Sequence, residues 1–289
     1  MIICSCCQTE YLSSEKNCPN CGFAVAIYNG VLLWAPEQYK INYNPENFAF
    51  FAELENNYFW FEARKKLLLH CLKKYFSGFG SLLEVGCGTG YLLSSVAKAF
   101  PQADLYASDV FIEALNFTAK KFQGRAKSPI LMRLDARDIP YREEFDAIVA
   151  LDVLEHIEED SLVIKNFFAA TKKGGGLIVT VPQHQRLWGK ADEDAGHVRR
   201  YEISDLREKI KAAGYSVIFS GSFVSLLLPA IFLSRRRGGK NNPQFKELGI
   251  SSGLNRLLSG IMTLEYHLIK LGLRFPWGGS RLLVAKKLA

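Results

Sequence analysis

Short apolar runs alternate with amphipathic stretches over most of the chain after about residue 80. The apolar runs have the length of strands, and apolar positions in the stretches between them recur every three to four residues, as in helices. The expected strands are 81–85, 105–108, 130–134, 145–151, 174–181, 215–220 and 281–286, and the expected helices begin near Gly90 and cover about 111–123, 158–171 and 203–213. This alternation predicts an α/β fold.

The turn after the first expected strand carries glycine at alternate positions. Glycines stand at 86, 88 and 90, after Glu84, in the pattern E-x-G-x-G-x-G. Glycine allows a sharp turn and a close approach of a ligand, while the amides of the next helix point at that ligand. Tyr91 stands where the dinucleotide pattern G-x-G-x-x-G has its third glycine. Because Glu84 would repel a pyrophosphate but suits a cationic amino-acid group, the loop favours S-adenosylmethionine over NAD.

Four motifs in sequence order resemble those of the class I S-adenosylmethionine-dependent methyltransferases. LLEVGCGTGYLL resembles their glycine loop, YASDV (106–110) the end of their second strand, RLDARDIPY (133–141) their third strand and FDAIVALDVLEHI (145–157) their fourth. The resemblance covers roughly 58–220 and the last strand, and is to the branch that methylates small molecules and lipids. It implies a Rossmann-like sheet of seven strands, mostly parallel with the last strand antiparallel, and helices on both faces.

The resemblance also implies a set of cofactor contacts. Asp109 lies 23 positions after Gly86, close to the spacing of a carboxylate that accepts both ribose hydroxyls. Asp135 and Ala136 are expected at the adenine, with Asp138 as the alternative acceptor or a turn as the alternative role. The expected set is Glu84, Gly86, Cys87, Gly88, Gly90, Asp109, Val110, Asp135, Ala136, Leu151, Asp152, Tyr58 and Arg64.

The segment 39–78, before the first strand, is expected to be a helical cap on the cofactor pocket. Tyr58 and Trp60 lie in an aromatic run that leads into an amphipathic helix with Arg64. The resemblance implies that Tyr58 and Arg64 contact the cofactor and that Trp60 contacts the substrate. The alternative is that the rings pack the helix on the sheet and that Arg64 faces water.

The turn after the fourth strand is expected at the reaction site. Ligands of open parallel sheets gather beyond the carboxyl ends of the strands, which places Asp152, Glu155 and His156 there. His156 titrates nearest to neutral pH among them and is a candidate general base. Its alternative role is to cap the following helix or to pack beneath it.

The connection 183–201 is too long for a plain loop, and long loops at this edge of a sheet are usually functional. His197 is the second candidate base. Tyr201 is a candidate catalytic residue that orients the substrate. Trp188, Arg199 and Arg200 are candidates for binding it, since paired arginines hold phosphate or carboxylate groups. The alternative is a solvated loop whose arginines pair with its own acidic residues.

Residues 1–38 are predicted to form a zinc-ribbon-like module. Cys4 and Cys7, and then Cys18 and Cys21, make two C-x-x-C pairs, and each pair can direct two thiolates at one tetrahedral zinc ion. Zinc–thiolate bonds would replace the core that so short a segment cannot build. The alternatives are a ribbon that has lost its metal and free buried cysteines.

An insertion at 223–279 interrupts the last part of the predicted methyltransferase domain, 79–289. Its apolar segment 223–233 runs into three arginines at 235–237 and Lys240. Such a segment can lie among the headgroups of an anionic membrane. A second helix is expected at about 252–272. The alternative is a helical lid packed on the domain or on a second subunit.

Composition indicates the cellular compartment in which the protein is expected and the chemical state of its cysteines. Among 289 residues there are seven cysteines and a net charge of +7, and no apolar run is long enough to span a bilayer. The first residues lack the features of a signal peptide. A cytoplasmic protein is therefore expected, in peripheral contact with the inner face of the membrane if the insertion binds lipid. Its cysteines should be thiols or metal ligands.

The predicted function is methyl transfer from S-adenosylmethionine to a small-molecule, lipid-linked or glycan-linked acceptor, with O-methylation favoured. Such in-line displacement needs alignment and the removal of a proton rather than a catalytic triad. One alternative is an RNA methyltransferase that recognises its substrate through the ribbon, although ALDVLEH differs from the N/D-P-P-Y/F motif of base-amino methyltransferases. Another is a non-catalytic cofactor-binding partner protein. The acceptor atom and the oligomeric state stay open.

Overall fold

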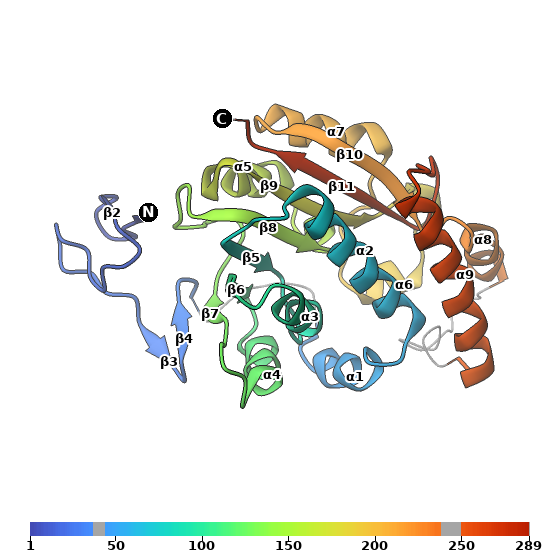
Figure 1. The fold of residues 1–289 in the computed structure, drawn as a ribbon, viewed down its shortest axis with the longest axis horizontal. Coiled ribbons are helices and arrows are strands. Elements are labelled where there is room, and N and C mark those ends of the chain that lie inside the picture. Colours follow the sequence, from blue (N-terminus) through green and yellow to red (C-terminus); the bar gives the residue numbers. More distant parts are fainter. Residues whose placement is uncertain (37–43, 238–249, 289) are drawn as a thin grey trace.

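The computed structural model describes residues 1–36, 44–237 and 250–288, and only the backbone of residues 234–237. Helices cover both faces of a central, mostly parallel sheet (Figure 1). This arrangement confirms the predicted α/β architecture. Lys240, part of the predicted basic cluster, lies outside the described residues, and the side chains of the three arginines are not described either.

The strands and helices follow one another along the chain in the order of their labels. The strands are β1 (Ile2–Ile3), β2 (Glu10–Tyr11), β3 (Ile27–Tyr28), β4 (Val31–Leu33), β5 (Ser81–Val85), β6 (Asp104–Asp109), β7 (Ile130–Arg133), β8 (Phe145–Leu151), β9 (Thr171–Pro182), β10 (Ser216–Phe223) and β11 (Ser280–Lys286). The α-helices are α1 (Asn47–Leu54), α2 (Phe59–Tyr75), α3 (Tyr91–Ala99), α4 (Ile112–Phe122), α5 (Asp160–Ala170), α6 (Lys190–Asp194), α7 (Ile203–Ala212), α8 (Leu228–Arg237) and α9 (Ser252–Lys270), with short 3-10 helices η1 (Leu154–His156) and η2 (Gln185–Leu187).

The main sheet has the strand order β10-β11-β9-β8-β5-β6-β7-β4-β3. β5 pairs in parallel with β6 and β8, and the parallel block continues to β7 on one side and to β9 on the other. β11 lies antiparallel between β9 and β10. The chain order reverses at β5, so the crevice beside this strand is the position where open α/β sheets bind ligands.

The sheet has nine strands among the described residues, and the prediction of seven was wrong. The two additional strands come from the cysteine-bearing segment. β4 pairs in parallel with β7, with Val31 opposite Leu131, and β3 forms a hairpin with β4. β7 would otherwise be an edge strand with unpaired backbone groups, and β4 satisfies them.

Alternate residues of the central strand face two separate cores. Leu82 belongs to the core beneath α2, α3 and α9, whereas Leu83 belongs to the core beneath α5 and α7. Both side chains are almost fully buried. This two-sided burial explains why Leu82 and Leu83 are both apolar although they face opposite sides of the sheet.

The insertion between β10 and β11 packs on the domain. α9 runs along α2 (Figure 1), and the backbone N–H of Phe59 donates to Asn255 Oδ1 at 3.0 Å. Glu265, buried in α9, accepts hydrogen bonds from the backbone N–H groups of Ser225 and Leu226, both at 2.8 Å. The described helices include none that is both long and apolar enough to cross a membrane.

Candidate active site

The glycine loop joins β5 to α3 at the carboxyl edge of the sheet. Gly86 has φ +68° and Gly90 has φ +72°, values that side-chain-bearing residues rarely adopt. A Cβ atom on Gly86 would lie 2.6 Å from Val153 Cγ2, and one on Gly90 would lie 2.7 Å from Thr118 Oγ1. Both the conformation and the packing therefore require glycine at these two positions.

Asp109 ends β6 and holds the glycine loop in place. Its Oδ2 accepts the backbone N–H of Gly88 at 3.0 Å, and its Oδ1 accepts that of Phe111 at 3.1 Å. Burial raises the pKa of Asp109 to about 6, although these hydrogen bonds act in the opposite direction. The carboxylate is placed at the carboxyl end of its strand, where the predicted ribose acceptor belongs.

Glu84 lies at the bottom of the same crevice. Its side chain is almost fully buried, and Oε2 has no hydrogen-bonding partner among the described residues. Burial raises the pKa of Glu84 to about 8, and the nearby Arg64 opposes the increase. A cationic group of a ligand would therefore favour the ionised carboxylate.

Arg64 of α2 reaches across to the end of β8. Its Nη1 lies 3.0 Å from Asp152 Oδ2, and its Nη2 lies 3.4 Å from Thr180 Oγ1, which in turn donates to Asp152 Oδ1 at 2.9 Å. Asp152 has φ +56°, an uncommon conformation that clusters at functional sites. The cap helix is thus tied to the reaction edge of the sheet, and the alternative of a solvent-facing Arg64 is wrong.

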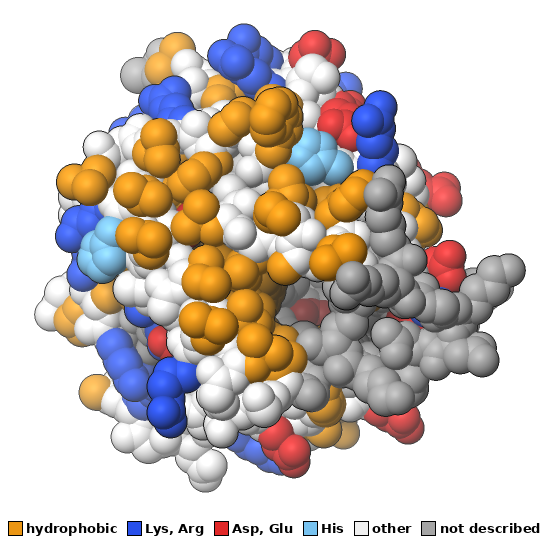
Figure 2. Space-filling view, turned by 90° about the vertical axis from the view of Figure 1, so that its right-hand side faces the viewer, with side chains coloured by type: hydrophobic (Ala, Val, Ile, Leu, Met, Phe, Trp, Pro, Cys, Tyr) orange, Lys and Arg blue, Asp and Glu red, His pale blue; other side chains and the backbone are white. Residues whose placement is uncertain are grey.

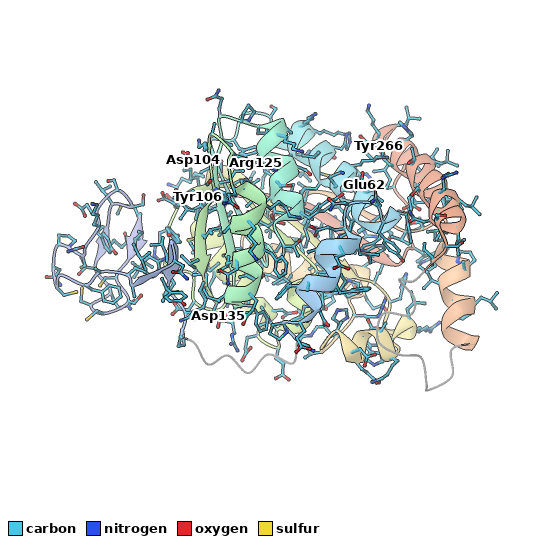
Figure 3. The ribbon with its side chains drawn as sticks, turned by 90° about the horizontal axis from the view of Figure 1, so that it is seen from below. Glu62, Asp104, Tyr106, Arg125, Asp135 and Tyr266 are labelled. Atoms are coloured by element: carbon cyan, nitrogen blue, oxygen red, sulfur yellow. The ribbon has the colours of Figure 1, made fainter. Side chains whose placement is uncertain are left out.

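Asp135 follows β7 at the same edge. Figure 3 places it at the opposite end of the sheet from Asp104, where β6 begins. The Asp135 carboxylate accepts the backbone N–H of Arg137 at 2.8 Å and pairs with the guanidinium of that residue at 2.9 Å. Ala136 is buried beside it, so both predicted adenine contacts border the crevice.

One cavity of about 1050 Å³ brings most of the predicted site residues together. Its lining includes Tyr58, Trp60, Arg64, Glu84, Gly86, Cys87, Gly88, Asp109, Val110, Asp135, Ala136, Leu151, Asp152, His156, His197 and Arg200. The lining does not include Gly90, Asp138, Trp188, Arg199 or Tyr201. The volume exceeds that of most pockets for a single small ligand.

A cluster of ionisable side chains occupies one corner of the cavity. The His156 and His197 rings meet edge to face with centroids 4.8 Å apart, and His197 Nε2 lies 4.0 Å from Glu155 Oε1. Asp192 Oδ1 lies 3.0 Å from His197 Nδ1. Burial lowers the pKa of His156 to about 4, with a further contribution from His197. His156 is therefore neutral at physiological pH.

Tyr201 and Arg199 lie outside the cavity and serve a buried ionic network instead. Tyr201 is fully buried, and its hydroxyl donates to Asp160 Oδ2 at 2.7 Å. Arg199 Nη1 and Lys209 Nζ each lie 2.7 Å from the same oxygen. Contrary to the sequence-based expectation, neither residue faces the crevice, because Asp160 at the start of α5 draws both toward the opposite face of the sheet.

Helices α8 and α9 close the other side of the cavity with apolar side chains. Ile231 of α8 and Leu254 and Leu258 of α9 line this wall, together with Val224 and Leu227 from the segment before α8. Leu257 of α9, and Leu271 and Trp277 after this helix, expose 62%, 85% and 65% of their surface. Figure 2 shows hydrophobic side chains gathered over this face of the molecule.

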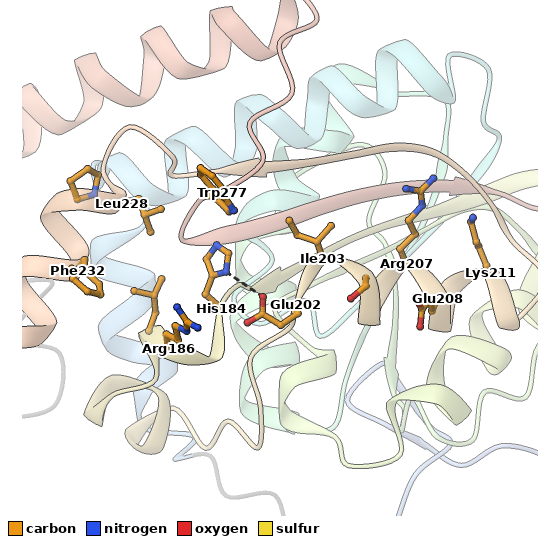
Figure 4. Close-up of a pocket in the computed structure, with 13 residues that line it drawn as sticks. His184, Arg186, Glu202, Ile203, Arg207, Glu208, Lys211, Leu228, Phe232 and Trp277 are labelled. Atoms are coloured by element: carbon orange, nitrogen blue, oxygen red, sulfur yellow. Dashed lines mark ion pairs between the residues drawn. The ribbon is translucent and has the colours of Figure 1, made fainter.

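A second cavity, of about 1220 Å³, lies on the other side of α8 (Figure 4). Leu228 and Phe232 of α8 line it together with Trp277, and Arg186, Arg207 and Lys211 add positive charge. His184 Nδ1 forms an ion pair with Glu202 Oε2 at 3.4 Å, drawn as a dashed line in Figure 4. α8 is thus a partition with one face toward each cavity.

The four paired cysteines converge at the amino-terminal end of the chain. Cys4 Sγ lies 3.5 Å from Cys21 Sγ, and Cys7 Sγ lies 3.6 Å from Cys18 Sγ. All four sulfur atoms lie within 4.8 Å of one another. Zn–S bonds of about 2.3 Å in a tetrahedron require sulfur atoms about 3.8 Å apart. The donor set therefore fits a zinc ion.

The structure adds site residues that were not among the predicted ones. Phe48 of α1 lies over Gly88, and Glu55 pairs with Lys121 while accepting a hydrogen bond from Thr89 of the glycine loop. No local sequence signal distinguishes Glu55 from Glu53, two positions before it. The sequence places Glu155 at the reaction edge without indicating a role for it. For Asp192 it indicates only an ion pair within the loop 183–201.

The similarity to a known protein family covers the central part of the chain. Residues 83–177 match the family model described as a methyltransferase domain. The match begins in β5 and ends in β9, so it contains the glycine loop, Asp109, Asp135 and the β8 turn. It supports the predicted S-adenosylmethionine-dependent methyltransferase. Residues 1–36 lie outside the match.

A curated relative and two solved structures illustrate the range of similar proteins. Malonyl-[acyl-carrier protein] O-methyltransferase from Bacillus anthracis is 31% identical over 103 residues, which are 35% of this chain and 38% of that protein. The chain therefore spans well under half the length of this relative.

The two structures share the fold at low identity. Phosphoethanolamine N-methyltransferase 2 from Haemonchus contortus, in complex with S-adenosylmethionine, matches with TM-score 0.53 and 15% identity over 78% of this chain and 53% of that chain. The [4+2]-cyclase SpnF matches with TM-score 0.51 and 21% identity over 78% and 82%. Because one is named a methyltransferase and the other a cyclase, they show the fold alone.

Proposed function

We propose that this protein transfers a methyl group from S-adenosylmethionine to an oxygen of a small-molecule, lipid-linked or glycan-linked acceptor. The observation that carries the proposal is the single cavity that combines a glycine-loop wall with an apolar wall from α8 and α9. The matched methyltransferase domain contributes the first wall. The second wall suits an acceptor with an extended apolar part.

The residues present fit the cofactor at four points. Asp109 would accept the ribose hydroxyls, and Asp135 with the Ala136 backbone would contact the adenine. Glu84, whose buried Oε2 lacks a partner among the described residues, would meet the cationic amino group. Arg64 would bind the carboxylate of the same amino-acid tail and exchange its ion pair with Asp152. Val110 and Leu151 supply apolar contacts between these groups.

S-adenosylmethionine, when bound, supplies a methyl group on cationic sulfur, which the acceptor oxygen takes in an in-line displacement that leaves the electron pair on sulfur. The chain has to align the acceptor and remove its proton. His197 is the better base, because Asp192 holds its Nδ1 and leaves Nε2 as the acceptor nitrogen, 4.0 Å from Glu155 in the cavity lining. The low pKa of His156 makes it a weak one. Trp60 and Arg200 line the acceptor side, whereas Trp188 does not.

The acceptor class is supported by the outer surface of the same helices. The exposed apolar side chains of α9 form a face on the helix that also supplies Leu254 and Leu258 to the cavity wall. Such a face can rest on a lipid surface and pass a lipid-linked acceptor inward. The malonyl-[acyl-carrier protein] relative is named for O-methylation of a carrier-linked acceptor, which supports oxygen as the methylated atom.

The cysteine module is proposed to hold structural zinc through Cys4, Cys7, Cys18 and Cys21. Among the described residues, the lining of the cavity begins at Phe48, so no part of the 1–36 segment borders it. The module is joined to β7, at the opposite end of the sheet from the strands that flank the insertion. A stabilising role therefore has more support than recognition of RNA.

The decisive experiment incubates the purified protein with radiolabelled methyl donor and separate RNA, lipid and small-molecule extracts. Label in a lipid or small-molecule fraction, absent from an Asp109→Ala variant, is the expected result. Label in RNA alone rejects the proposed acceptor class. Binding of S-adenosylhomocysteine by calorimetry without transfer to any fraction favours a non-catalytic partner protein, and the absence of binding rejects the cofactor itself.

A further inference from the structure

Three metal-ligating side chains meet at the corner of the cavity next to η1. One ligand atom each from Glu155, His156 and His197 lies within 4.8 Å of the others. All three side chains line the cavity. Glu155 and His156 are adjacent in η1, whereas His197 arrives from the loop after β9, so the cluster exists only in the folded chain.

Glu155 is the member of the cluster that most requires a ligand. Its side chain is 0% exposed, and neither carboxylate oxygen has a hydrogen-bonding partner in another residue of the described chain. The positive charges of Arg64 and Arg200 act on this carboxylate, but Arg64 is paired with Asp152 at 3.0 Å and Arg200 is paired with Asp192 at 2.7 Å. A carboxylate buried without a partner is costly, and coordination of a cation removes that cost.

The histidines are oriented as ligands by neighbouring groups. Asp192 Oδ1 lies 3.0 Å from His197 Nδ1, which fixes the proton on that nitrogen and directs the Nε2 lone pair toward Glu155. Asp192 is held in turn by Arg200 and by the backbone N–H of Gly189, at 2.9 Å. His156 hydrogen-bonds the backbone of Gly196. Histidine ligands of metals commonly have such outer partners.

We propose that Glu155, His156 and His197 bind a divalent first-row transition-metal cation of the Mn(II) or Fe(II) type. Two imidazoles and one carboxylate that leave further coordination positions open are the donor set these ions take. The open positions face the cavity, because all three residues line it. This site is separate from the cysteine cluster, whose four thiolates select zinc.

The inference rests on the proposed methyl transfer and changes how the acceptor loses its proton. An acceptor oxygen coordinated to the cation would have a lower pKa and would release its proton to solvent before it attacks the methyl carbon. His156 and His197 would then act as ligands instead of bases. The cation would also orient the acceptor at the end of β8, beside Asp152.

The test titrates Mn(II) into the full-length protein while the resonance of free Mn(II) is followed by electron paramagnetic resonance. The sample is first dialysed against a chelator and resupplied with one equivalent of Zn(II) for the cysteine cluster. We expect one bound Mn(II) per chain. Affinity should fall at least about tenfold in both Glu155→Gln and His197→Ala, and by a similar factor in Asp192→Asn. Glu158→Gln, at the rim of the same cavity, is the matched control and should keep its affinity within about twofold.

A second readout locates the ion. Bound Mn(II) should broaden the imidazole proton resonances of His156 and His197 more strongly than those of His70, whose ring contacts Tyr266 of α9. A wild-type chain that binds no Mn(II), a Glu155→Gln variant that binds it equally well, or broadening elsewhere would overturn the site. S-adenosylhomocysteine binding is measured on the same samples. Cofactor binding without Mn(II) binding rejects the metal site and leaves the proposed function intact, whereas loss of both in the wild type rejects the function.

Discussion

The two walls of the cavity are built by different means. The cofactor wall consists of turns after β5, β6 and β7 that are held by hydrogen bonds from backbone N–H groups to carboxylates, such as the bond from Gly88 N–H to Asp109 Oδ2. The acceptor wall consists of apolar side chains from α8 and α9, which reach the cavity from a distant part of the chain. Backbone geometry restricts the first wall to few residue types, whereas size and polarity alone restrict the second. Changes to the two walls should therefore have separable effects.

The largest effect is expected from Asp109→Ala in the cofactor wall. The variant loses the carboxylate that would accept the ribose hydroxyls and that orders the glycine loop. Hydrogen bonds to a charged acceptor are each worth about 1.5–3 kcal/mol, so S-adenosylhomocysteine should bind at least about 100-fold more weakly. Isothermal titration calorimetry measures the affinity, and circular dichroism confirms the fold. A Kd within fivefold of the wild type would contradict the assignment of this wall.

A smaller effect is expected from Leu258→Asp in the acceptor wall, and it should change the use of the acceptor instead of the binding of the cofactor. Leu258 lines the cavity, whereas Leu257, its neighbour on α9, points outward. An unpaired carboxylate against an apolar acceptor should lower kcat/KM for the acceptor by about tenfold or more. Binding of S-adenosylhomocysteine should not change.

Leu257→Asp is the matched control for that variant. It should leave kcat/KM for a water-soluble acceptor unchanged and reduce sedimentation with anionic phospholipid vesicles by about twofold or more. If both leucine variants alter the same quantity, α9 does not separate a cavity face from a lipid face.

Lowering the pH should moderately weaken the binding of a nucleoside to the part of the cofactor wall that contains Asp109. The pKa of Asp109 in the free protein is about 6, and the ribose hydroxyls would donate to the ionised form. Protonation below this pH removes that acceptor, so affinity for methylthioadenosine should fall about tenfold between pH 7 and pH 5. This ligand lacks the amino-acid tail and so does not engage Glu84. An Asp109→Asn variant should bind weakly at both pH values, and an equal pH dependence in that variant would exclude Asp109 as the titrating group.

The smallest effect on either wall is expected from zinc removal. Cys4→Ser should abolish zinc binding and lower the melting temperature by several degrees, since the metal replaces a core in that segment. Affinity for S-adenosylhomocysteine should stay within about twofold, because the 1–36 segment does not line the cavity. Cys6→Ser is the control, because Cys6 is exposed and outside the four-cysteine cluster. A parallel loss of cofactor affinity in Cys4→Ser would show that the module supports the site.

Local patterns predicted the cofactor wall well because each of its parts lies within one strand and the turn that follows it. The strand 81–85 and the helix after Gly90 appear where the pattern placed them. Strand ends set by distant partners were less accurate. β10 was expected to end at 220 but continues to Phe223, because β11 pairs with it as far as Ser280.

The reaction corner was harder to predict because it depends on which side chains of one loop turn inward. His197 and Arg200 line the cavity, but Arg199 and Tyr201, their neighbours in sequence, turn to Asp160. No local signal distinguishes them, since all four have chemistry suited to a site. Burial and long-range ion pairs determine which of these side chains line the cavity.

The sequence by itself determined the α/β alternation, the glycine turn and the carboxylate at the end of β6, because these depend on residues close together in the chain. Only the tertiary structure decided that β4 extends the sheet, that α8 and α9 form the second wall, and that Glu155, His156 and His197 share one corner. These features depend on edge pairing, apolar packing and desolvation between segments far apart in sequence, and such energies exist only in the folded chain.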